Sequence, residues 1–145
     1  MKKSWLYLYL GFLSLMFAGC DARSAAPVTA TKMVGGLDHP WGMTFLPNEE
    51  ILITERSGHL RSVQKGKLSP PIKGVPKVYA QGQGGLLGVV AHPQFTENRL
   101  IYLAYSGAGE GGASTELVRG QYQQGKLTNL QKLFVALPKV ESGHH

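Results

Sequence analysis

The sequence predicts an all-β fold. From about residue 31 onward, no stretch of the chain keeps the apolar spacing of an amphipathic helix. Short runs rich in branched and aromatic residues alternate instead with glycine- and proline-containing turn signals. Features of the first half of this region also recur in the second half, at spacings of 46 and then 59 residues. Together these observations predict short antiparallel strands arranged in two similar units.

Residues 1–19 precede this region and predict a secretory signal peptide. Lys2 and Lys3 stand before an apolar run over residues 5–18. The run is shorter than the roughly 20 residues that a helix needs to span a bilayer. A charged start followed by a short apolar run is typical of an export signal. We therefore expect an exported protein.

Cys20, the only cysteine in the chain, ends the sequence Phe-Ala-Gly-Cys. This sequence resembles a bacterial lipobox, in which the cysteine carries the lipid, although Phe17 stands where leucine is usual. A lone cysteine cannot form an internal disulfide, which also favours lipidation; a plain signal peptide with an incidental cysteine is the alternative. We expect a lipid anchor on the periplasmic face of a bacterial membrane. Asp21, which follows the cysteine, resembles the inner-membrane retention signal of enterobacterial lipoproteins. Because that rule does not hold in every bacterium, the sequence leaves both the inner and the outer membrane open.

Residues 20–30 then predict the lipidated cysteine and a flexible tether, and residues 31–145 predict the folded part. The tether is small, polar and contains proline. Removing residues 1–19 takes away two lysines and lowers the net charge from +6 to +4. The remaining basic residues are scattered and are not interleaved with aromatic residues, which argues against a nucleic-acid surface.

Six runs predict the strands of the folded part. Arg-Ser-Gly separates the first two runs as a hairpin turn, and the last run could also form one or two turns of helix, although its flanks favour a strand. Residues 107–112 match the letters of a dinucleotide fingerprint, but the helix and the acid that this motif requires do not follow. We interpret 107–114 as a flexible hairpin loop. The predicted strands are residues 51–55, 59–63, 86–91, 100–106, 115–122 and 129–137.

The internal repeat predicts the architecture. Residues 42–47 and 88–93 share glycine and proline at the same spacing, and each segment leads into an apolar strand. Residues 64–69 and 123–128 form the same kind of turn. Four strands in a unit of 40–50 residues is typical of a β-propeller blade. Two blades alone would leave open edges and apolar faces, so we expect this chain to be the beginning of a longer protein.

Gln83 is the first candidate for a binding site. It stands between glycines directly before a predicted strand. Glycines allow a close approach of the backbone to a ligand, and the amide offers both a donor and an acceptor. An ordinary exposed glutamine in a loop is the alternative. Elsewhere, no pair of histidines or acids has the spacing of a zinc site, and no nucleophile motif occurs.

His144 and His145 close the chain. They could be the start of a purification tag, although no linker precedes them. They could also belong to an active site, because a histidine with a pKa near 6.5 can act as a general base at neutral pH. The residues that follow in a longer protein would separate these alternatives.

From about Met33 to His145, the chain resembles the N-terminal third of the soluble PQQ-dependent aldose sugar dehydrogenases. These are the glucose/sorbosone dehydrogenase-like proteins of bacterial periplasms. The most specific motifs are His-Pro-Trp, Gly-Gln-Gly-Gly-Leu-Leu-Gly and the closing Gly-His-His. The resemblance is carried, in order, by residues 37–47, 51–63, 82–95, 101–106 and 137–145.

The resemblance implies a six-bladed β-propeller that binds pyrroloquinoline quinone (PQQ) and calcium and oxidises the anomeric carbon of an aldose to a lactone. Gln83 matches a glutamine at the cofactor and sugar site, and His145 matches the catalytic histidine. His144 matches a sugar-contacting position that is usually Asn or Asp. The other PQQ and calcium ligands are expected beyond residue 145, which implies that this chain alone is inactive. An external acceptor would take the electrons.

Two other functions are compatible with the same propeller fold. One is a non-catalytic binding module, anchored to the membrane as a scaffold. The other is a metal-dependent, lactonase-like enzyme. Phe or Gln after His145, followed by glycines and an arginine, would favour the dehydrogenase, whereas further histidines would indicate a tag.

Overall fold

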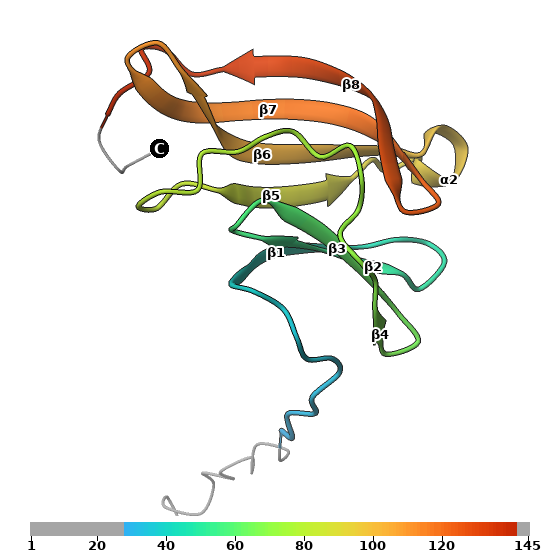
Figure 1. Ribbon diagram of the computed structural model, residues 1–145. Coiled ribbons are helices and arrows are strands. Elements are labelled where there is room, and N and C mark those ends of the chain that lie inside the picture. The colour runs from blue at the N-terminus through green and yellow to red at the C-terminus, as the bar shows by residue number, and fades with distance from the viewer. Residues whose placement is uncertain (1–27, 142–145) are drawn as a thin grey trace, which may run out of the picture. The chain divides into compact units, whose positions relative to one another are not determined.

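The described residues form two antiparallel sheets of four strands each, in sequence order (Figure 1). The six predicted strands are among them, whereas the strands at residues 40–45 and 67–68 were not predicted. The structure, a computed structural model, describes residues 28–141. Cys20, His144, His145 and the predicted signal peptide lie outside the described residues. The first sheet contains β1 (Pro40–Phe45), β2 (Ile51–Glu55), β3 (His59–Gln64) and β4 (Lys67–Leu68). The second contains β5 (Leu86–Ala91), β6 (Leu100–Gly109), β7 (Gly112–Gln123) and β8 (Lys126–Val135).

The two sheets confirm the predicted pair of four-stranded blades, and the repeat extends to single turns. Between β3 and β4, Lys65 has φ 50° and Gly66 has φ 72°; between β7 and β8, Gln124 has φ 50° and Gly125 has φ 72°. Two successive residues with positive φ are typical of a type I′ turn, whose twist suits a tight hairpin. Each blade therefore closes its last hairpin with the same turn.

The predicted hairpin loop over residues 107–114 is wrong in its extent. Strands β6 and β7 remain paired up to Gly109 opposite Gly112, so that only Glu110 and Gly111 form the turn. Gly107 shows why glycines occur inside these strands: a Cβ atom there would lie 2.3 Å from the Glu116 carboxyl carbon. The glycine supplies room for a buried side chain, rather than flexibility.

A short helix between β5 and β6 was not predicted. It is α2 (Phe95–Asn98), and it buries Phe95 against the core. Four residues are too few to show a helical period in the sequence. Among the described residues, no helix has the length and apolar character needed to cross a membrane.

A single apolar core joins the two sheets. Side chains from β2 and β3 pack with side chains from β5, β6 and β7 in one buried cluster. Burial of such side chains is the main favourable contribution to folding, at about 25 cal/mol per Å² of apolar surface. The fully buried members are Leu52, Leu60, Leu86, Ile101 and Leu103.

Thr54 and Gly42 set how closely the sheets meet. The Thr54 hydroxyl donates to the Leu87 carbonyl at 2.5 Å and accepts from the Gly42 amide at 2.9 Å. A Cβ atom on Gly42 would lie 2.8 Å from the same Leu87 carbonyl oxygen, so only glycine fits between β1 and β5. The hydroxyl thus connects the two blades where β1 passes close to β5.

The face of β1 that points away from β5 is apolar and exposed. Trp41, Met43 and Phe45 are 62%, 62% and 65% exposed. By the 46-residue repeat, Met43 corresponds to Val89, which is 4% exposed in the core between the two sheets. The first blade therefore presents to solvent the kind of face that the second blade buries. Contiguous apolar surface of this kind marks a contact surface.

Replacing Thr54 with valine should destabilise the protein by about 1–3 kcal/mol, because it leaves polar backbone groups without their hydroxyl partner. The free energy of unfolding, measured by urea denaturation, checks this value. Thr128→Val is the matched control, because the Thr128 hydroxyl makes only an exposed contact of 3.5 Å. Equal effects of the two substitutions would contradict the role assigned to Thr54.

Candidate functional site

Several connections meet at one end of the two sheets, which we call the loop end (Figure 1). We define it by residues 38–39, 56–58, 79–85, 110–111 and 136–141. Backbone hydrogen bonds join these segments: the Leu86 amide donates to the Arg56 carbonyl, and the Val140 and Ala113 amides donate to each other's carbonyls. The loop end therefore brings together both blades and the segment that follows β8.

Gln83 lies at the loop end, exposed on a tight turn. The Gly84 amide donates to the Gln81 carbonyl at 2.8 Å and closes the turn. Gly82 has φ 57°, and its carbonyl accepts a hydrogen bond from the Arg56 guanidinium. Arg56 therefore fixes the turn that carries Gln83.

The glycines after Gln83 allow the turn to pack tightly. Gly85 has φ 145°, and a Cβ atom there would lie 2.1 Å from the Arg56 carbonyl oxygen. A Cβ atom on Gly84 would lie 2.5 Å from the Tyr79 carbonyl oxygen. The Ser106 amide donates to the Gly85 carbonyl at 2.9 Å. Backbone contacts thus hold the turn on both sides. The Gln83 side chain therefore extends from a fixed backbone position.

Asp38 and His39 form a second polar group at the loop end. The His39 Nδ1 and Asp38 Oδ1 atoms are 2.5 Å apart, and the His39 carbonyl accepts from the Arg56 amide. Hydrogen bonds from His39 and then Ser57 lower the pKa of Asp38 below its usual value. A hollow of about 280 Å³ opens here, lined by Asp38, His39, Arg56, Ser57 and Ala80.

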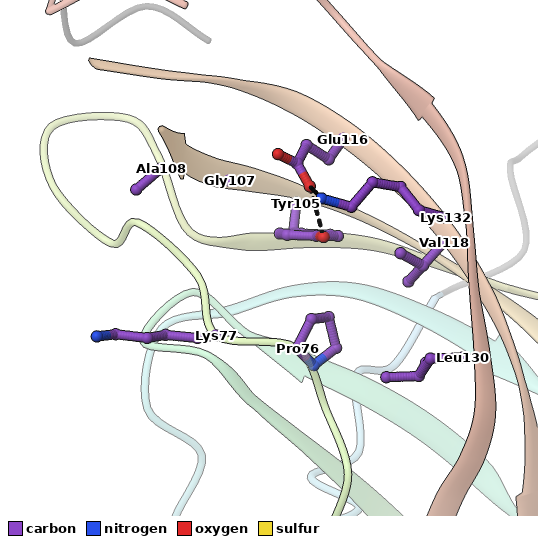
Figure 2. Close-up of a pocket in the computed structure, with 9 residues that line it drawn as sticks. All are labelled: Pro76, Lys77, Tyr105, Gly107, Ala108, Glu116, Val118, Leu130 and Lys132. Atoms are coloured by element: carbon purple, nitrogen blue, oxygen red, sulfur yellow. Dashed lines mark hydrogen bonds and ion pairs between the residues drawn. The ribbon is translucent and has the colours of Figure 1, made fainter. Parts of the chain in front are cut away.

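Glu116 is a buried acid of the second blade that contacts three polar side chains. Its side chain is buried, and its Oε2 atom lies 2.7 Å from both the Tyr105 hydroxyl and the Lys132 ammonium. Figure 2 shows both groups reaching this carboxylate. The Oε1 atom lies 2.7 Å from the ammonium of Lys139, in the segment after β8. A hollow of about 380 Å³ borders the cluster, lined in part by Pro76, Lys77 and Leu130.

These contacts set the charges of the cluster. Burial alone would raise the pKa of Glu116, but hydrogen bonds from Lys132, Lys139 and Tyr105 outweigh it and lower the pKa to about 2. Burial, and then the hydrogen bond to Glu116, raise the pKa of Tyr105. At neutral pH, Glu116 is therefore an anion and Tyr105 a protonated donor.

The structure places only one of the predicted site residues. Gln83 is at the loop end, while the lipidation candidate Cys20 and the two histidines His144 and His145 lie outside residues 28–141. Within that range, no three histidine, cysteine or acidic side chains gather closely enough to hold a metal ion. The sequence had not singled out Glu116 or Lys139, although Glu116 shares an inward-facing register with apolar residues of β7.

The chain is similar to known sugar dehydrogenases. A sequence model of the family described as Glucose / Sorbosone dehydrogenase matches residues 37–145. Aldose sugar dehydrogenase YliI of Escherichia coli (strain K12) is 44% identical over 141 residues, which cover 92% of this chain and 38% of that protein. The chain therefore spans well under half of this relative's length.

Solved structures show the same likeness. A glucose dehydrogenase superimposes with a TM-score of 0.70 at 48% identity, over 72% of this chain and 32% of its own. The PQQ-bound aldose sugar dehydrogenase of Streptomyces coelicolor gives a TM-score of 0.65 at 25% identity, over 75% of this chain and 34% of its own.

Replacing Glu116 with glutamine should remove a pH-dependent part of the stability. The pKa of Glu116 is lower in the folded state than its ordinary value of 4.5. The wild type should therefore have a larger free energy of unfolding than the variant, and this advantage should be fully present above about pH 4.5. That advantage, on the order of 3 kcal/mol, should be lost as the pH falls toward 2. Urea denaturation of both proteins at a series of pH values checks this dependence.

Glu97→Gln is the control for this experiment, because Glu97 is an exposed acid on α2. A difference between wild type and Glu116→Gln that stays constant from pH 7 to pH 3 would contradict the assigned ion pairs.

Proposed function

Because the chain belongs to the glucose/sorbosone dehydrogenase family, we propose that it is the N-terminal part of a PQQ-dependent aldose dehydrogenase. The reaction would oxidise the anomeric carbon of an aldose to a lactone, and an external acceptor would then take the electrons. One observation carries the proposal: the family match over residues 37–145 includes both the rigid Gln83 turn and the closing histidines.

The loop end fits the part of a PQQ and sugar site that this chain would supply. Gln83 is exposed, and its turn is fixed by Arg56 and by close glycine packing. Its side-chain amide can donate a hydrogen bond to an oxygen of one ligand and accept a hydrogen bond from a hydroxyl of the other ligand. PQQ, when bound, supplies the quinone that accepts hydride, and the protein orients the sugar against it. In this proposal Gln83 binds both molecules.

His145 is the proposed general base. A neutral imidazole takes the proton of the anomeric hydroxyl on a ring nitrogen, while the C1 carbon loses its hydride and the carbonyl of the lactone forms. A pKa near the working pH suits this transfer, which contributes typically 10²–10⁴-fold to the rate. His144 is proposed to contact the sugar. Calcium and the remaining PQQ contacts are assigned to residues beyond this chain.

We place this enzyme on the periplasmic face of the membrane. The apolar run at residues 5–18 directs export, and Cys20 carries the lipid after removal of residues 1–19. Several acyl chains on one cysteine would hold the protein firmly, since each buried CH₂ contributes about 0.8 kcal/mol. The exposed apolar face of β1 is assigned to contact with a further blade of the same propeller.

Replacing His145 with alanine in the full-length protein should lower kcat by about 10²–10⁴-fold, because it removes the base. The assay supplies PQQ, Ca²⁺, an aldose and an artificial electron acceptor whose reduction is followed by absorbance. PQQ affinity should change little. His92→Gln is the control, because His92 lies at the opposite end of the second blade, where it contacts Asn98.

Near-normal turnover in the His145→Ala protein would show that the base is assigned wrongly. A wild-type protein that oxidises no aldose in the presence of PQQ and Ca²⁺ would rule out the proposed reaction.

Replacing Cys20 with serine should release the protein from the membrane, because serine cannot form the thioether that carries the lipid. Fractionation of bacterial cells, combined with metabolic labelling by a radioactive fatty acid, measures this change. The wild type should label and sediment with membranes, and the variant should do neither. Equal labelling of both proteins would contradict the lipid anchor.

A further inference from the structure

The segment after β8 is fixed along the start of β7. The Ala136 amide donates to the Thr115 carbonyl at 2.9 Å, and Val140 pairs with Ala113 through two hydrogen bonds of 3.0 and 3.1 Å. A Cβ atom on Gly112 would lie 2.1 Å from the Val140 carbonyl oxygen, so the two backbones touch. The segment after β8 thus packs directly against the β6–β7 hairpin.

Lys139 fastens this segment by its side chain. Its ammonium donates to the Gly107 carbonyl at 2.7 Å, to the Ser114 hydroxyl at 3.1 Å and to Glu116 Oε1 at 2.7 Å. These three acceptors match the three donors of an ammonium group. The side chain is 11% exposed and crosses Gly109, where a Cβ atom would lie 2.6 Å from the lysine Cδ atom.

Glu116 is oriented independently of Lys139. Its Oε2 atom is held by Tyr105 of β6 and Lys132 of β8, both at 2.7 Å, which leaves Oε1 directed at Lys139. A buried carboxylate fixed by the sheet is costly to leave partly unpaired. The sheet therefore holds the Glu116 carboxylate in position, and Lys139 of the segment after β8 binds its Oε1 atom.

From this geometry we propose that Lys139 is a positioning residue, whose ion pair with Glu116 docks residues 136–141 at the loop end and so fixes the point from which the chain continues toward His145. His145 follows Lys139 by six residues. The inference rests on the proposed function, because it assumes that His145 is the base. Lys139 itself would contact neither the sugar nor the cofactor.

The test compares two substitutions that each remove one lysine from the same carboxylate. Lys139→Met removes the contact from the segment, and Lys132→Met removes the contact from the sheet, while both leave one lysine on Glu116. In the full-length protein with PQQ and Ca²⁺, Lys139→Met should lower kcat at least tenfold more than Lys132→Met. KM for the aldose should differ less than threefold between the two proteins, and Lys139→Arg should recover part of kcat.

Amide hydrogen exchange gives a readout that does not depend on turnover. Peptides covering residues 136–141 should exchange faster in Lys139→Met than in wild type, and should be unchanged in Lys132→Met. Equal exchange and equal kcat in the two variants would overturn the positioning role.

The two proposals fail in different ways. If His145→Ala abolishes turnover but Lys139→Met keeps wild-type kcat, the positioning role is wrong and the proposed reaction stands. If His145→Ala retains turnover, the base is wrong, and Lys139 then docks a segment without positioning a catalytic group, which also overturns the inference. Faster exchange combined with a selective loss of kcat supports it.

Discussion

The close approach of β1 and β5 at Gly42 is the contact on which the rest of the structure depends. The Thr54 hydroxyl bonds to both strands there, and the absence of a side chain on Gly42 lets the Leu87 carbonyl come near. This contact sets the two blades in register, so that the end of β2 meets the start of β5. Arg56 can then bind the turn that carries Gln83. A polar contact within the core thereby determines the geometry of a surface loop.

Each blade also uses a buried glutamate to hold a chain segment at the loop end. In the first blade, Glu55 accepts from the Asp38 amide at 2.9 Å, just before β1, and pairs with Arg61. In the second blade, Glu116 binds Lys139, just after β8. Buried carboxylates are stable only with such partners. The segments that approach the loop end therefore supply hydrogen bonds that the two sheets require.

The sequence could predict those parts of the fold that depend on local pattern. Strands β2, β3 and β5–β8 follow from alternation and turn residues, whereas β1 and the two-residue β4 were not predicted. The matching turns at Gly66 and Gly125 follow from the repeat. The long β6–β7 hairpin could not be predicted, because glycines that make room for Glu116 look the same as glycines of a flexible loop. Glu116 itself was detectable only as an acid in an inward-facing register.

The type I′ turn between β7 and β8 has a practical use. It lies at the opposite end of the second sheet from the loop end, because consecutive antiparallel strands turn at alternate ends. Gln124 is exposed there, and a Cβ atom on the neighbouring Gly125 would meet nothing within 4 Å. The only native thiol of the chain is Cys20. A cysteine introduced at Gln124 would thus accept a fluorophore or a surface linker, and would orient the immobilised protein with the loop end facing solution.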